Sequence, residues 1–145
     1  MQALRDAAAT QAFGRQLALR LPAGSILLLA GDLGAGKTCL VQGLAAGLGI
    51  EEPITSPTFA LAQHYPLQPA GGLVHLDLYR LELAAAADEL FAQEEEEARA
   101  LGALLAVEWP ERLSRPPAGC WQIQLSLSDP SNPEAGRLIE VRSPS

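Results

Sequence analysis

The stretch that decides the fold is residues 31–38, which read Gly31-Asp-Leu-Gly-Ala-Gly36-Lys37-Thr38. It fits the pattern G-x-x-x-x-G-K-[ST] of a phosphate-binding P-loop. The context agrees, because the apolar run at 25–30 predicts a buried strand before the loop and a helix is predicted at 37–48 after it. Glycines let successive backbone N–H groups curve around a phosphate, and the helix N-terminus adds partial positive charge. Lys37 is predicted to reach the β- and γ-phosphates, and the Thr38 hydroxyl to ligate Mg²⁺.

Buried strands and helices alternate along the rest of the chain. They are predicted at 2–20 (helix), 59–65 (strand), 73–79 (strand), 84–100 (helix) and 103–107 (strand). This alternation indicates an α/β protein with a P-loop NTPase fold, whose mostly parallel sheet is flanked by helices. Additional strands at 121–127 and 138–142 are predicted to be antiparallel neighbours. With 145 residues and no internal repeat, the chain is expected to form a single domain, 1–145.

Composition excludes several classes of protein. The 17 acidic and 10 basic residues give a net charge of -7, which argues against a chain that binds nucleic acid or an anionic membrane by itself. No apolar run approaches the roughly 20 residues of a membrane span, so no membrane association is expected. The N-terminus lacks the pattern of a secretory signal, and the two cysteines and two histidines show no zinc-ligand spacing. A cytoplasmic protein with reduced thiols is therefore expected.

Lysine usage supports the P-loop assignment. Nine of the ten basic residues are arginine, and the only lysine is Lys37. Arginine does not replace lysine where a compact point charge must meet a phosphate. The alternative, a glycine-rich turn with an incidental lysine, does not explain this position. A single lysine also excludes the N/T-K-x-D motif of GTPases, which leaves a small P-loop kinase or a nucleotide-gated binding module as alternatives to an ATPase.

Acidic residues at predicted strand ends are candidates to complete the site. Asp77 is placed where a second metal-binding carboxylate lies beside a P-loop, although a strand-end turn residue is the alternative. Glu108 follows a buried strand and is expected at the ligand-binding edge, where it can orient water or hold a metal through water. Trp109 is either a core aromatic or a wall of the nucleotide site. The loop at 55–58 offers a hydroxyl group to Mg²⁺ or the γ-phosphate, but, taken alone, an ordinary Ser/Thr/Pro loop is the better explanation.

Two other features are predicted to be structural. His75, in the apolar strand before Asp77, is interpreted as a satisfied core or edge histidine. The run of glutamates at 94–97 is interpreted as a solvated face of a helix.

Together, four motifs resemble the TsaE family of small bacterial ATPases. In chain order they are the P-loop, T-S-P-T-F at 55–59, H-x-D-x-Y-R at 75–80 and E-W-P-E at 108–111. The resemblance extends over about residues 10 to 140. It implies an ATP-hydrolysing component of tRNA threonylcarbamoyladenosine synthesis, the modification of the adenosine next to the anticodon. It also implies the partner proteins TsaD and TsaB, through which tRNA is contacted only indirectly.

The resemblance further implies the residues of the site. ATP and Mg²⁺ are expected on the P-loop, at Leu33, Gly34, Ala35, Gly36, Lys37 and Thr38. Thr58, Asp77 and Glu108 are expected around the metal and the γ-phosphate. Trp109 is expected beside the nucleotide, and Gly136-Arg137 matches a pair that approaches it in the family. Lys37, Asp77 and Glu108 are then the expected catalytic residues.

Overall fold

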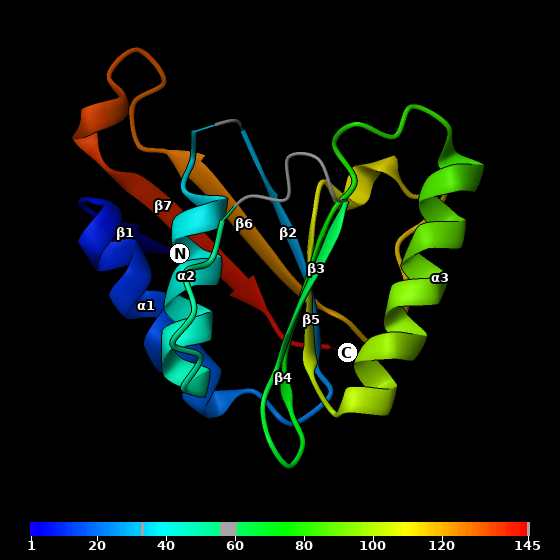
Figure 1. Ribbon diagram of the computed structural model, residues 1–145. Coiled ribbons are helices and arrows are strands. Elements are labelled where there is room, and N and C mark those ends of the chain that lie inside the picture. Colours follow the sequence, from blue (N-terminus) through cyan, green and yellow to red (C-terminus); the bar gives the residue numbers. More distant parts are fainter. Residues whose placement is uncertain (33, 56–60, 145) are drawn as a thin grey trace.

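The computed structural model describes residues 1–32, 34–55 and 61–144 (Figure 1). The strands are β1 (Gln2–Leu4), β2 (Ile26–Gly31), β3 (Ala62–Pro66), β4 (Gly72–Asp77), β5 (Leu104–Glu108), β6 (Trp121–Leu127) and β7 (Arg137–Arg142). The helices are α1 (Ala7–Arg20), α2 (Lys37–Leu48) and α3 (Ala84–Leu101), with the short 3-10 helices η1 (Pro110–Arg112) and η2 (Pro133–Ala135). None of the helices in these ranges is both long and apolar enough to cross a membrane.

The strands form one seven-stranded sheet in the order β1-β7-β6-β2-β5-β4-β3. The central strands β6, β2, β5 and β4 run parallel, while β7 and β3 are added antiparallel on either side. The predicted α/β class, the parallel sheet and the antiparallel pair β6–β7 are therefore confirmed. Because parallel strands end at the same edge, the register brings Asp77 of β4 opposite Glu108 of β5, and Glu108 opposite Leu29 of β2.

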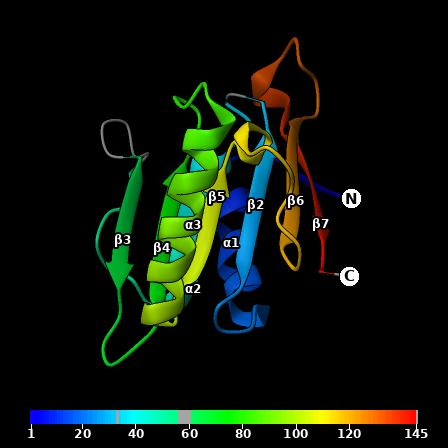
Figure 2. The same cartoon turned by 90° about the vertical axis from the view of Figure 1, so that its right-hand side faces the viewer.

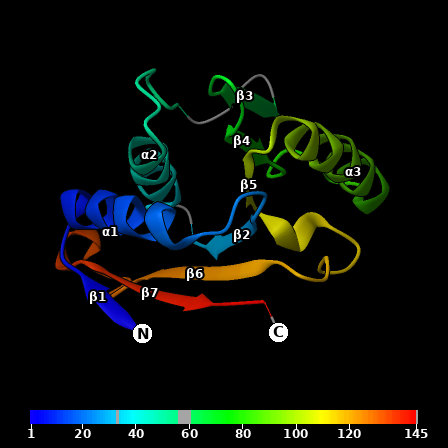
Figure 3. The same ribbon diagram turned by 90° about the horizontal axis from the view of Figure 1, so that it is seen from below.

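Helices cover both faces of the sheet, with α1 and α2 on one side and α3 on the other (Figures 2 and 3). Alternate residues of each central strand face the two layers. In β2, Leu27 and Leu29 belong to the core beneath α1 and α2, whereas Leu28 belongs to the core beneath α3. Burial on both faces explains why the central strands read as continuous apolar runs rather than as alternating ones.

The N-terminal segment differs from the prediction of one helix over 2–20. Residues 2–4 form β1, which pairs antiparallel with β7, and Leu4 is buried. The helix begins at Ala7, because the Asp6 carboxylate caps it by accepting a hydrogen bond from the Ala9 N–H at 2.8 Å. Helix-like spacing of apolar residues was thus overridden by pairing with a strand from the other end of the chain.

Other boundaries differ less. The strand predicted at 59–65 is β3, which is described from Ala62 onward; residues 59 and 60 lie outside the described residues. The strand predicted to reach residue 79 ends at Asp77. The helix at 84–100 is confirmed as α3, one residue longer.

The interpretation of residues 94–97 as a solvated face is wrong for Glu94. Its side chain is only 7% exposed, and its Oε2 lies 2.6 Å from Nε2 of His64 on β3. The helical period explains this, because Glu94 shares the buried face of α3 with Phe91 and Ala98. Glu96 and Glu97 are exposed, as expected.

Candidate functional site

The P-loop joins β2 to α2 at the carboxyl edge of the parallel strands. Gly34 and Gly36 have φ values of 80° and 101°, in the left-handed region that favours glycine. Gly36 also caps α2, and a Cβ built on it would lie 3.0 Å from Nε of Arg137. The glycine therefore lets the Arg137 side chain approach the loop closely. Leu33, the remaining member of the predicted loop site, lies outside the described residues.

Lys37 is buried beside this loop, with only 6% of its surface exposed. Its Nζ donates a hydrogen bond to the Gly31 carbonyl at 2.6 Å and lies 3.9 Å from the centre of the Trp109 ring. Burial lowers the pKa of Lys37, because it removes water from the ammonium group. Nearby carboxylates oppose that shift, namely Glu108, Glu111, Asp77 and Asp32.

Asp77 is the last residue of β4, on the face of the sheet that α2 covers. Its Oδ1 accepts a hydrogen bond from the Tyr79 N–H at 2.9 Å, which fixes the carboxylate at the strand end. Burial raises the pKa of Asp77, and the Glu108 carboxylate raises it further, while the Tyr79 hydrogen bond opposes both effects. Both causes disfavour ionisation of Asp77, and a carboxylate held in this way beside a second one forms a site suited to a cation.

Glu108, the last residue of β5, is only 3% exposed. Its Oε2 lies 2.6 Å from Nε2 of His75, which is fully buried in β4. The interpretation of His75 as a satisfied core histidine is confirmed for this nitrogen. The partner Glu108 was not predicted for His75, although the two-residue period of a strand places His75 on the same face as Asp77.

Trp109 has φ 60° and is the only residue other than glycine with positive φ in the described ranges. Such backbone conformations cost about 1–3 kcal/mol and gather at functional sites. The conformation places the indole over Lys37 and against Tyr79, with ring centres 4.8 Å apart. The guanidinium of Arg112 in turn lies 5.7 Å from the centre of the Tyr79 ring. Of the two interpretations left open for Trp109, a wall beside the P-loop lysine agrees with this placement.

Arg137 begins β7, and its side chain lies close to Gly36 of the P-loop. Its Nε is buried and has no hydrogen-bond partner among the described residues. Buried donors are normally paired, so an unpaired one next to a P-loop is suited to an anion. Thr38 is the second residue of α2 and is half-buried, whereas Thr58 lies outside the described residues.

Comparison with known proteins identifies the family. The family model described as Threonylcarbamoyl adenosine biosynthesis protein TsaE matches residues 4–135. The chain belongs to the TsaE family.

Relatives of this TsaE chain are similar over most of its length. The tRNA threonylcarbamoyladenosine biosynthesis protein TsaE of Synechocystis is 51% identical over 118 residues, which are 79% of this chain and 73% of that protein. The protein of the same name from Nostoc is 42% identical over 138 residues, which are 95% of this chain and 82% of that protein. Among solved structures, Bacillus subtilis YdiB is similar with a TM-score of 0.69 and 29% identity, covering 99% of this chain and 84% of YdiB.

The residues of this TsaE chain fit Mg²⁺ only together with a nucleotide. The described residues contain no group of three or more histidine, cysteine, aspartate or glutamate side chains that would hold a metal alone. Mg²⁺ usually takes one or two protein ligands and completes its shell with water and phosphate oxygens. The Thr38 hydroxyl and the Asp77 carboxylate are chemically suited to that smaller role, since one follows the P-loop lysine and the other ends β4.

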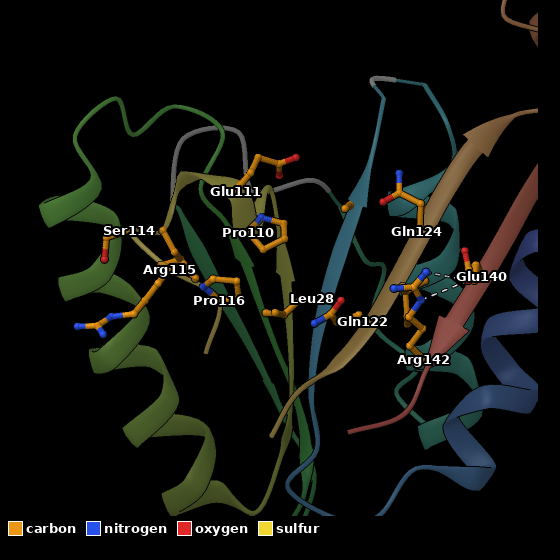
Figure 4. Close-up of a pocket in the computed structure, with 13 residues that line it drawn as sticks. Leu28, Pro110, Glu111, Ser114, Arg115, Pro116, Gln122, Gln124, Glu140 and Arg142 are labelled. Atoms are coloured by element: carbon orange, nitrogen blue, oxygen red, sulfur yellow. Dashed lines mark hydrogen bonds and ion pairs between the residues drawn. The ribbon is translucent and has the colours of Figure 1, made fainter. Parts of the chain in front are cut away.

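A separate pocket of about 420 Å³ lies on the α3 side of the sheet (Figure 4). It is lined by the segment 110–116 and by polar side chains of β6 and β7, including Gln122, Gln124 and Arg142. Neither Lys37 nor Asp77 lines it, so it is distinct from the P-loop site.

Proposed function

We propose that this chain is a Mg²⁺-dependent ATPase that acts in the synthesis of tRNA threonylcarbamoyladenosine. The observation that carries the proposal is the convergence of two cations and two carboxylates on one P-loop. Lys37 and Arg137 supply positive charge beside the loop. Asp77 and Glu108 end β4 and β5, the two successive parallel strands on one side of β2. Phosphoryl transfer relies mainly on positioning and charge stabilisation, which such an arrangement provides.

Phosphate binding would exchange the present contacts of Lys37 for stronger ones. The ammonium group now donates to one backbone carbonyl and lies against an aromatic ring. Phosphate oxygens carry full negative charge, and hydrogen bonds between charged groups are about twice as strong as neutral ones. Arg137 would donate its unpaired Nε–H to the same anion. These two side chains would thus hold the phosphates together.

Hydrolysis would then take place at the carboxyl edge of the parallel strands, where β4 and β5 end. Water attacks the γ-phosphorus, the bond from phosphorus to the bridging oxygen breaks, and ADP leaves with the electron pair. The proton that the water loses would pass to an oxygen of the released phosphate. Mg²⁺, when bound, neutralises charge on the β- and γ-phosphate oxygens. Thr38 and Asp77 would hold that ion, with Thr58 as a further ligand. Glu108 would accept a hydrogen bond from the attacking water and fix its direction.

The biological role is proposed from the relatives. Proteins that are 42–51% identical to this chain carry the name tRNA threonylcarbamoyladenosine biosynthesis protein TsaE. We propose TsaD and TsaB as partners, and contact with tRNA only through them, because a net charge of -7 repels a polyanion. Cys39 and Cys120 are free thiols, which suits the cytoplasm as the proposed place of action.

Phosphate release from ATP by the purified chain, alone and with TsaD and TsaB, tests the proposal. We expect hydrolysis that requires Mg²⁺, and we expect Glu108→Gln to lower its rate by about 10²–10⁴-fold with little change in ATP affinity. Glu111→Gln is the matched control, since it removes the same charge from an exposed position near Lys37. A Glu108→Gln protein that hydrolyses ATP as fast as the wild type contradicts the proposed site.

Failure to bind the partner assembly contradicts a different part of the proposal. If the chain hydrolyses ATP but does not bind TsaD with TsaB under any nucleotide condition, the ATPase remains and the role in tRNA modification is wrong.

A further inference from the structure

The described residues contain two histidine–glutamate pairs, which have the same Nε2–Oε2 distance. His75 on β4 and Glu108 on β5 are joined at 2.6 Å beside the P-loop. His64 on β3 and Glu94 on α3 are also joined at 2.6 Å, on the other side of the sheet from α2. The first pair is almost completely buried, with side chains 0% and 5% exposed, whereas the His64 side chain is 39% exposed.

Burial makes the first pair costly for the stability of the fold, which points to a role other than stability. Its two polar groups lie where water is excluded, and Nδ1 of His75 has no hydrogen-bond partner among the described residues. Buried polar pairs of this kind often contribute less to stability than apolar side chains of similar volume. A core position in β4 would be filled more favourably by leucine, as at the neighbouring Leu73 and Leu76.

The hydrogen bond selects one tautomer for a neutral His75 that faces an ionised carboxylate. An ionised carboxylate only accepts hydrogen bonds, so the proton of a neutral His75 lies on Nε2 and Nδ1 is left as an acceptor. An acceptor without a partner is tolerated more readily than an unpaired N–H. Nε2–H then holds one oxygen of Glu108, Oε2. This leaves the other oxygen, Oε1, available to contact a ligand at the carboxyl edge of the sheet.

We propose that His75 is a positioning residue for ATP hydrolysis. By donating Nε2–H to Oε2, it fixes the rotamer of Glu108 and aims Oε1 at the attacking water. The inference rests on the proposed role of Glu108 and adds a residue that touches neither the nucleotide nor the water. The parallel register supports it, because His75 pairs with Ala106 and Asp77 with Glu108, so that the imidazole lies one step behind the carboxylates on the same face.

Single-turnover hydrolysis, affinity for a fluorescent ATP analogue and the melting temperature are measured for two variants. His75→Leu removes the donor, and we expect a hydrolysis rate about 10–100-fold lower, as for other residues that orient an active-site ligand, with ATP affinity within about threefold. His75→Gln keeps an amide N–H near the position of Nε2, and we expect it to recover most of the lost rate. Recovery by glutamine separates positioning from simple filling of space, since leucine fills the space equally well.

A double-mutant cycle with Glu108→Gln isolates the coupling. If His75 acts only through Glu108, His75→Leu has no further effect on the rate in the Glu108→Gln background. His64→Leu is the matched control, because it breaks a pair of the same type and length away from the P-loop. We expect His64→Leu to leave the hydrolysis rate unchanged, whatever it does to the melting temperature.

The outcomes separate the two proposals. The inference is overturned if His75→Leu hydrolyses ATP at the wild-type rate, or if leucine and glutamine lower the rate equally and additively with Glu108→Gln. In these cases a slow Glu108→Gln protein leaves the proposed ATPase intact. If instead Glu108→Gln has the wild-type rate, the proposed role of Glu108 fails and the role of His75 fails with it. Should His75→Leu not fold, His75→Asn replaces it, because the shorter side chain cannot place an amide N–H at the position of Nε2. A wild-type hydrolysis rate for His75→Asn equally overturns the inference.

Discussion

Replacing Lys37 by methionine removes a charge while keeping most of the volume of the side chain. In the nucleotide complex Lys37 would make hydrogen bonds to two charged phosphates, worth about 3–6 kcal/mol together. Against this, the lysine gives up its bond to the Gly31 carbonyl and its contact with Trp109, a loss of roughly 1–2 kcal/mol. The net loss for Lys37→Met is therefore about 1–5 kcal/mol, or roughly 5- to 4000-fold in the Kd for ATP.

Although Lys37→Met should weaken ATP binding, it should not lower the stability of the fold, which thermal denaturation measures. Burial lowers the pKa of Lys37 below its usual value of 10.5, so the folded state binds fewer protons than the unfolded state between the lowered pKa and 10.5. The stability contribution of Lys37 is therefore unfavourable below its folded pKa and improves as pH rises through it. Methionine has no proton to lose, so we expect the variant to be at least as stable as the wild type at neutral pH.

Titration with a fluorescent ATP analogue is the decisive assay. Arg115→Met is the matched control, because it removes a cation from an exposed position outside the P-loop. We expect the control to bind the analogue like the wild type. A Lys37→Met protein with wild-type affinity refutes the assignment of Lys37 as a phosphate ligand, and a less stable variant refutes the argument from burial.

Three further predictions concern the metal site, the aromatic wall and the helix pair. Because burial raises the pKa of Asp77, the free energy of unfolding falls as pH rises from 3.8 through that raised pKa. Asp77→Asn should abolish this fall and raise the melting temperature at neutral pH. The same variant should weaken the Mg²⁺ dependence of hydrolysis. In a Trp121→Phe background, the emission of Trp109 should change on addition of MgATP, and an unchanged spectrum would contradict displacement of Lys37 from the ring. Gly14→Ala should lower the free energy of unfolding by about 1–3 kcal/mol in chemical denaturation, since its Cβ would meet the Leu40 carbonyl at 2.5 Å, and an unchanged midpoint would show that α1 and α2 separate without cost.

Local patterns predicted the parts of the site that lie at element boundaries. The P-loop follows an apolar run, and Asp77 and Glu108 each end one, so a parallel sheet necessarily brings them to one edge. Contacts that depend on the register between distant strands left no local signal. The pairing of His75 with Glu108 requires knowing that β4 lies beside β5, and β1 forms only because β7 returns to it from the other end of the chain.

The backbone at Trp109 was also beyond local reasoning. Nothing in the letters Glu108-Trp109-Pro110 distinguishes a core aromatic from one held in the left-handed region over a lysine. The conformation depends on what the indole contacts, and those contacts come from the P-loop and from Tyr79, in a separate strand connection. The sequence therefore predicted the residue as a candidate and left its role open.

The charges of the site explain why a nucleotide and a metal ion should bind there together. Burial shifts the pKa values of Lys37 and Asp77 in the directions that favour their neutral forms. The buried Nε–H of Arg137 has no hydrogen-bond acceptor among the described residues. In a structural network these groups would pair with one another, but Lys37 is bonded to a backbone carbonyl and Asp77 to a backbone N–H. Phosphate alone would satisfy the two cations and repel the carboxylate, whereas Mg²⁺ alone would do the reverse. Only the complex of both would relieve all three unfavourable states. In the proposed function, the site would therefore cost stability in the free protein and return that free energy as affinity for MgATP.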